Sequence, residues 1–263
     1  MLPATRVLSV VIVPFLVVAF VVLYGFPNDT KRLFAWTIKP SMTPMMLGSV
    51  YLGGAYFFVQ AFRASRWHAV KSGFVSVATF ASLMGVATVI HWDRFNHHHV
   101  AFWIWAALYF TTPFLVAGTW LLNRRTEPPA TQGEVLLTQV ARRIIGALGV
   151  MAVALGLYLF LLPSRAIDIW PWALTPLTSR VMGAIFMLGL AGLGVFVDPR
   201  WSTARLMVQV QSLMMALILV AAVRAHRDFD SGRPMTWLLI GGFSVTLVGA
   251  VVLTRTMDAR SAE

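Results

Sequence analysis

The stretch WTIKPSMTPMMLGSVYLGG at residues 36–54 has a counterpart later in the chain, WALTPLTSRVMGAIFMLG at residues 172–189. Both stretches begin with a tryptophan, place a proline four residues later and share two glycines that lie six residues apart. The corresponding positions are Trp36 and Trp172, Pro40 and Pro176, Gly48 and Gly183, Gly54 and Gly189, and further along Arg66-Trp67 and Arg200-Trp201. The sequence therefore predicts an internal duplication.

The composition indicates that a lipid bilayer surrounds this chain. Hydrophobic residues make up 58% of its 263 residues, charged residues only 12%, and the mean hydropathy is +0.75. A β-barrel is not expected, because its strands would alternate polar and apolar residues. Apolar stretches of about 20 residues, the length that spans a bilayer as a helix, occur at 7–26, 43–62, 71–91, 99–122, 143–162, 180–197, 205–223 and 236–254.

We therefore predict an all-α integral membrane protein whose eight transmembrane helices form two parallel four-helix repeats. Four crossings return the chain to its starting side, so a pseudo-twofold axis along the membrane normal should relate the repeats. The first repeat is expected at residues 1–122, a polar connector at 123–140 and the second repeat at 141–263. The stretch 7–26 is expected to be a retained helix, because no small-residue cleavage site follows it.

The net charge of +11 does not indicate a nucleic-acid partner. The 21 Lys and Arg residues gather at the predicted helix ends, where such residues set topology and contact lipid headgroups. More of them lie on the face that holds the termini, so we predict a plasma membrane of bacterial type with both termini cytoplasmic. The expected partners are membrane lipids and another membrane protein. The absence of cysteine excludes disulfides and thiol chemistry.

Tryptophans on the face opposite the termini are candidates for the mouth of a ligand cavity, and the alternative is an aromatic belt at the membrane boundary. No charged residue lies in the middle of a predicted span, which argues against an ion-coupled carrier. Glutamines are the most polar side chains there, and they can also serve as hydrogen-bonding contacts between helices. The candidate cavity residues are Trp36, Trp92, Trp170, Trp172, Gln60, Gln209 and Gln211.

The most polar loop is HWDRFNHHH at residues 91–99, and its counterpart is AHRDFD at residues 225–230. Imidazoles with nearby carboxylates suit Zn²⁺ or Cu²⁺, and two histidines can ligate a haem iron. The alternatives are a plain polar loop near the headgroups and a pH-sensitive acid–base role. The candidate metal or haem ligands are His91, His97, His98, His99, His226, Asp93 and Asp228.

The pairs Arg66-Trp67 and Arg200-Trp201 are candidate lipid-headgroup anchors on the face with the termini, because arginine can reach phosphates from an interfacial position. Their recurrence is also what a duplicated scaffold alone would produce.

The sequence favours a non-catalytic function: binding or moving an apolar or amphipathic small molecule, or serving as a membrane subunit of a larger complex. The alternative is a redox membrane protein that uses the histidine loop to hold a metal or haem. A third hypothesis is an enzyme acting on lipid headgroups with His91, Asp93 or Asp228 as acid or base. No P-loop, nucleophile-elbow or HExxH motif is present, so the chain is not expected to be an enzyme of those classes.

Overall fold

The computed structural model describes residues 3–124 and 134–261, and these ranges are all-helical. Apart from an isolated β-bridge between Leu136 and Arg200, no β-structure occurs within them. Residues 125–133, which belong to the predicted connector at 123–140, lie outside the described residues.

Eight helical segments of the described ranges are long and apolar enough to cross a membrane, so the protein is a multi-pass integral membrane protein. At 1.5 Å per residue, a segment of 22 residues is about 33 Å long, which matches a bilayer core of about 30 Å. Each segment overlaps one of the eight predicted stretches, and that prediction is confirmed. The segments are α1 (Pro3–Phe20) with a π-helical turn (Val21–Gly25), α3 (Met42–Arg63), α4 (Lys71–Ile90), α5 (Val100–Asn123), α6 (Gln139–Leu161), α8 (Pro176–Phe186) continued through a 3-10 turn into α9 (Leu190–Val197), α10 (Trp201–Arg224) and α11 (Pro234–Arg260).

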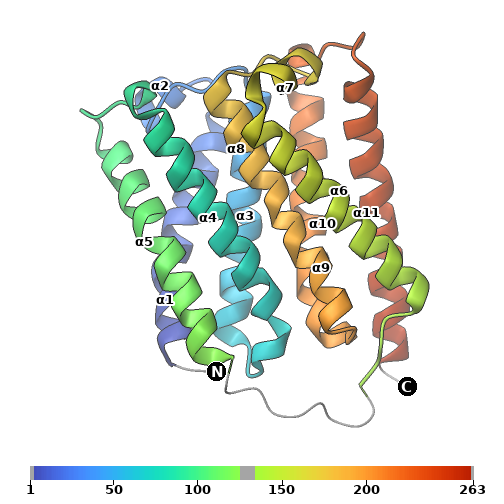
Figure 1. The fold of residues 1–263 in the computed structure, drawn as a ribbon. Helices are drawn as coiled ribbons and strands as arrows, with labels where there is room; N and C mark the ends of the chain where they lie inside the picture. Colours follow the sequence, from blue (N-terminus) through green and yellow to red (C-terminus); the bar gives the residue numbers. More distant parts are fainter. Residues whose placement is uncertain (1–2, 125–133, 262–263) are drawn as a thin grey trace.

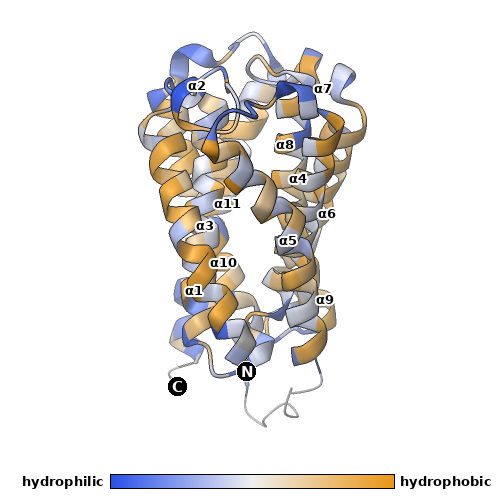
Figure 2. Ribbon diagram, turned by 90° about the vertical axis from the view of Figure 1, so that its left-hand side faces the viewer, coloured by the Kyte–Doolittle hydropathy of each residue, from blue (hydrophilic) through white to orange (hydrophobic). Residues whose placement is uncertain are grey.

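The eight segments stand side by side, and the two ends of the chain lie at the same end of the bundle (Figure 1). The short helices α2 (Thr30–Leu33) and α7 (Pro163–Ile169) lie at the opposite end, which we call the outer face. Hydrophobic residues predominate along the helices, and hydrophilic residues gather at the ends, strongly around α2 and α7 (Figure 2). This distribution is the one expected of helices that cross a bilayer.

Four segments form the centre of the bundle, since α3, α4, α8 with α9, and α10 contact one another. The other four pack outside them: α1 against α3, α5 against α4, α6 against α8 and α9, and α11 against α10. The outer helices therefore expose most of their side chains to the surroundings of the bundle. Only 11% of the apolar window of α11 is buried, the smallest share among the eight segments.

Glycine lets α6 and α8 approach until their backbones touch. A Cβ atom added at Gly183 would lie 2.7 Å from the carbonyl oxygen of Gly156, and one added at Gly156 would lie 2.8 Å from that of Gly183. Both distances are too short for a side chain. Small residues at helix contacts are typical of membrane proteins, because close backbones gain van der Waals packing that lipid does not supply.

The two loops at 91–99 and 225–233 connect the halves of the chain crosswise at the outer face. The carboxylate Oδ2 of Asp228 accepts a hydrogen bond from the backbone N–H of Met42, the first residue of α3, at 2.8 Å. His91 Nε2 lies 2.7 Å from the guanidinium of Arg180 in α8. Each loop is therefore bonded to the first turns of a helix in the other half.

Candidate lipid-facing cavity

A cavity of about 410 Å³ lies among α1, α3, α4 and α5, with further walls from α9 and α10. Three of these helices contribute a proline or a glycine to its lining. Pro14 lies within α1, where it cannot donate a backbone hydrogen bond. Gly54 on α3 and Gly73 on α4 also line the cavity and present no side chain to it. Its volume falls in the range of about 300–1,000 Å³ that is typical of small-molecule sites.

The cavity wall is apolar and rich in aromatic rings. No Asp, Glu, Lys, Arg or His belongs to the lining among the described residues. Its polar side chains are two tyrosines with Ser76, Thr112 and Gln211. The aromatic residues of the wall are Phe15, Phe34, Tyr51, Phe57, Phe58, Phe80, Trp105 and Tyr109. Such a surface suits an apolar molecule, because an ion would lose its hydration without gaining a counter-charge.

The cavity reaches the outside of the bundle between α1 and α5. Phe15 and Val18 on α1 and Ile104 on α5 line the cavity and are themselves exposed, Val18 to 63%. Contact between α1 and α5 is sparse, because α1 packs chiefly against α3 and α5 against α4. A molecule dissolved in the membrane therefore meets the cavity from the side, without passing through water.

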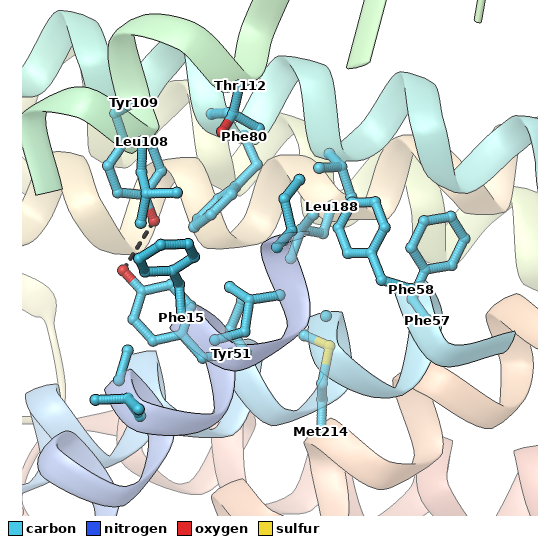
Figure 3. Close-up of a pocket in the computed structure, with 18 of the residues that line it drawn as sticks. Phe15, Tyr51, Phe57, Phe58, Phe80, Leu108, Tyr109, Thr112, Leu188 and Met214 are labelled. Carbon is cyan, nitrogen blue, oxygen red and sulfur yellow. Dashed lines mark hydrogen bonds between the residues drawn. The ribbon is translucent and has the colours of Figure 1, made fainter. Parts of the chain in front are cut away.

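Tyr51 and Tyr109 form the polar feature of the wall. Their hydroxyl oxygens lie 2.8 Å apart in a hydrogen bond that joins α3 to α5 (Figure 3). Both side chains are buried, and the ring of Phe80 packs 6.0 Å from that of Tyr109. Each tyrosine is the tenth residue of its helix, so the pair lies about 14 Å from the outer ends of α3 and α5. This places the two hydroxyls near the middle of the membrane.

Aromatic packing continues from the cavity to the outer face. The ring of Trp105 lies 4.3 Å from that of Tyr109 and 4.7 Å from that of Trp36, between centroids. Trp36 in turn contacts Phe95 of the 91–99 loop at 5.0 Å. The Trp105 indole donates to the hydroxyl of Thr88 at 2.9 Å, which fixes the ring. The outer end of the cavity is therefore closed by packed rings.

The structure places the predicted mouth tryptophans outside the cavity wall. Trp36, Trp170 and Trp172 are 4% exposed or less, and the Trp172 indole donates to the Thr43 hydroxyl at 2.9 Å. Trp92 is exposed and stacks on His97. The three buried rings therefore pack the interior of the outer end rather than form a belt at its surface.

The three predicted glutamines are divided among different surroundings. Gln211 lines the cavity from α10. Gln209 lies on the same helix and accepts a hydrogen bond from the Tyr56 hydroxyl at 3.1 Å, which joins α3 to α10. Gln60 lies in α3, outside the lining. The structure thus brings one of the seven predicted cavity residues to this wall.

The predicted metal ligands do not come together: no group of three or more His, Cys, Asp or Glu side chains with metal-site spacing occurs in ranges 3–124 and 134–261. His99 Nδ1 accepts the backbone N–H of Ala101 at the start of α5. His226 Nδ1 lies 3.2 Å from the Val223 carbonyl oxygen. His98 and Asp93 lie at the surface, where Asp93 pairs with Arg94 at 3.3 Å. The metal or haem hypothesis stays a prediction, which an absorption spectrum with elemental analysis tests.

The surroundings of His91 favour its neutral form. Burial lowers the pKa of the imidazole below its ordinary value, and the neighbouring Arg180 guanidinium lowers it further. A neutral ring can accept a hydrogen bond from Arg180 through Nε2. This contact gives His91 a structural role, because it joins the 91–99 loop to α8. The acid–base hypothesis for His91, Asp93 and Asp228 stays a prediction.

The two Arg-Trp pairs lie on the face with the termini. Trp67 and Trp201 are 2% and 3% exposed, and the Trp201 indole donates to Asp258 Oδ1 at 2.8 Å. Arg66 is exposed and lies 3.4 Å from Glu134. Only the side chain of Arg66 is open to a lipid phosphate among these three, and that contact stays a prediction.

Arg200 belongs to an ion-pair network that joins the halves on this face. Its guanidinium lies 2.6 Å from Asp198 and 3.2 Å from Glu134, and Lys71 of α4 lies 2.9 Å from Asp198. Burial raises the pKa of the Asp198 carboxyl, but hydrogen bonds from Arg200 and Lys71 outweigh it and hold that pKa well below its usual value. The Arg200 guanidinium therefore pairs with carboxylates of the protein itself.

Sequence reasoning did not find the tyrosine pair. The chain has five tyrosines, and both members of the pair lie near the middle of a predicted span, which was the available signal. Because 58 residues separate Tyr51 from Tyr109, the pair could be predicted only if the neighbouring helices were already known.

Comparison with protein-family models, with curated proteins and with solved structures gives no match for this chain. The functional interpretation therefore rests on the geometry of the cavity.

Proposed function

We propose that this membrane protein binds an apolar or amphipathic small molecule in the cavity between α1, α3, α4 and α5. The single observation that carries the proposal is a cavity of about 410 Å³ at membrane depth, apolar on its walls and reached from the side between α1 and α5. A membrane-soluble molecule that enters it exchanges lipid contacts for aromatic ones. The wall carries no Asp, Glu, Lys, Arg or His side chain among the described residues, which fits a binding role or a role in moving the ligand.

Ligand retention tests this proposal. Protein extracted in mild detergent should carry a small hydrophobic molecule that solvent extraction and mass spectrometry detect. In Gly54→Leu the new side chain would enter the cavity, since Leu16 Cδ1, 3.3 Å away, is the only atom near the added Cβ among the described residues. The variant should therefore lose most of the ligand.

Gly118→Leu is the matched control. Gly118 lies in α5 outside the lining, and a Cβ there meets no described atom within 4 Å. This variant should keep the ligand of the wild-type protein. Equal ligand content in both variants, or wild-type protein with no bound molecule and no affinity for apolar probes, would contradict the proposal.

We also propose that the two halves are parallel four-helix repeats related by a pseudo-twofold axis along the membrane normal. Helix contacts support this, because α3 packs against α10 as α8 and α9 pack against α4. Two hydrogen bonds also recur at corresponding positions. In the first pair, the Asn96 N–H donates to the Ala35 carbonyl, and the Asp230 N–H donates to the Pro171 carbonyl. In the second pair, the Trp103 indole donates to the His97 carbonyl, and the Trp237 indole donates to the Ser231 carbonyl.

An experimental structure tests the repeat. Superposition of residues 134–261 on residues 3–124 should need a rotation of about 180° around the membrane normal. A superposition that pairs the helices in another order would exclude the duplication. We further propose a plasma membrane of bacterial type with cytoplasmic termini, supported by the larger number of Lys and Arg on that face.

A second role, membrane subunit of a larger complex, is favoured by α11. This helix packs chiefly against α10, and large apolar side chains such as Trp237, Leu238 and Val245 are exposed along it. The partner would be another membrane protein. Native mass spectrometry after mild extraction tests this role, and a particle with the mass of one chain and no companion would count against it.

A further inference from the structure

One hydroxyl proton of the Tyr51–Tyr109 pair has no hydrogen-bond acceptor among the described residues. A tyrosine hydroxyl has one proton to donate, so the contact between Tyr51 and Tyr109 uses one of the two available protons. Neither hydroxyl makes another hydrogen bond within residues 3–124 and 134–261. One O–H donor therefore remains without an acceptor at the cavity wall.

This unsatisfied O–H donor lies where the lack of an acceptor costs free energy. Tyr51 and Tyr109 are 4% and 7% exposed, and both line the cavity. They lie near the middle of their helices, where lipid has no oxygen to accept the proton. A buried donor without a partner lowers stability, whereas an acceptor brought by a ligand would satisfy it.

The other residues of the cavity wall indicate the chemistry of the rest of the ligand. Rings surround the pair, with Phe15 and Phe80 next to the tyrosines in Figure 3 and Trp105 4.3 Å from Tyr109 between centroids. Aromatic rings prefer offset or edge-to-face contacts with other rings. The lining contains no charged side chain among the described residues, which disfavours an ionised ligand.

We infer that the ligand is a neutral, membrane-soluble ring compound that presents a carbonyl oxygen to the Tyr51–Tyr109 pair. This inference rests on the proposed binding function and names the chemical class of its ligand. The free O–H donates to the carbonyl, the aromatic walls hold the ring, and an apolar tail extends toward the opening between Val18 and Ile104.

A pair of matched probes tests the role of the carbonyl. Saturation binding to delipidated protein in detergent is measured for undecylnaphthoquinone and for undecylnaphthalene, which has the same rings and tail but no oxygen. Wild-type protein should bind the quinone about tenfold more tightly, the ratio expected from one satisfied buried hydrogen bond. In the double variant Tyr51→Phe, Tyr109→Phe, the ratio should fall to about one while the affinity for the hydrocarbon is kept.

Tyr56→Phe is the control variant, because the Tyr56 hydroxyl bonds Gln209 outside the cavity lining. It should retain the wild-type ratio. A ratio near one in wild-type protein, or an unchanged ratio in the double variant, overturns the carbonyl inference. If neither probe binds wild-type protein, the proposed binding function fails as well. Where the double variant does not fold, the wild-type ratio alone decides.

Discussion

Asp228 and Asp93 lie in the two outer loops, 225–233 and 91–99, but have different surroundings. Asp228 accepts a hydrogen bond from the first backbone N–H of α3, which carries no intrahelical partner. The negative charge also lies at the positive end of the α3 helix dipole. Asp93 is exposed and pairs only with its exposed neighbour Arg94 among the described residues. Of the two carboxylates, Asp228 is therefore the one that stabilises a helix.

Substitution of these two residues measures the difference. Asp228→Ala should lower the free energy of unfolding by about 1 kcal/mol, the usual cost of losing a helix cap. Asp93→Ala should change it by less than about 0.5 kcal/mol, since exposed ion pairs contribute little. Thermal unfolding of both variants in the same detergent gives the comparison. Equal losses, or a larger loss for Asp93→Ala, would contradict the capping role.

Residue types alone predicted some side-chain positions and missed others. Burial of Trp36, Trp170 and Trp172 could not be read from sequence, because a tryptophan before a helix fits both a membrane boundary and a packed interior. The tyrosine pair was missed since its two members come from helices far apart in the chain. Gln211 lies in the cavity lining, but its residue type alone does not separate a cavity residue from a hydrogen-bonding contact between helices, which is the role that Gln209 has.

At the scale of helices, length and hydropathy were sufficient to predict all eight spans. They could not predict the 3-10 turn (Met187–Gly189) that divides α8 from α9, because Met187, Leu188 and Gly189 are as apolar as their neighbours. Nor could they predict a cavity among α1, α3, α4 and α5. Its position depends on how helices pack, and apolar spans give little sign of their neighbours.

The contact between α6 and α8 gives a test at this scale. Gly183→Ala would place a methyl group against the Gly156 carbonyl and the Phe160 backbone, so the helices must separate. We expect a loss of about 1–3 kcal/mol, the usual cost of overpacking. Gly249→Ala is the control, because a Cβ at Gly249 in α11 meets no described atom within 4 Å. Unfolding of both variants in detergent is the measurement, and equal stability would refute tight packing at Gly183.

For the whole molecule, two exposed serines on opposite faces allow the proposed orientation in the membrane to be tested. Ser65 follows α3 on the face with the termini, and Ser231 lies in the 225–233 loop of the outer face. The chain has no cysteine, so Ser65→Cys and Ser231→Cys each carry a single thiol. In intact cells, a membrane-impermeant maleimide should label Ser231→Cys and should label Ser65→Cys only after permeabilisation. The reverse pattern would place the termini outside the cytoplasm.

The crosswise outer loops have a consequence for how this chain can evolve. Asp228 holds a helix start 186 residues before it, and His91 contacts an arginine 89 residues after it. A substitution at either residue therefore alters a contact with the opposite half of the chain. Compensating changes should arise there, so the halves cannot accumulate substitutions independently. Each half therefore constrains the sequence of the other.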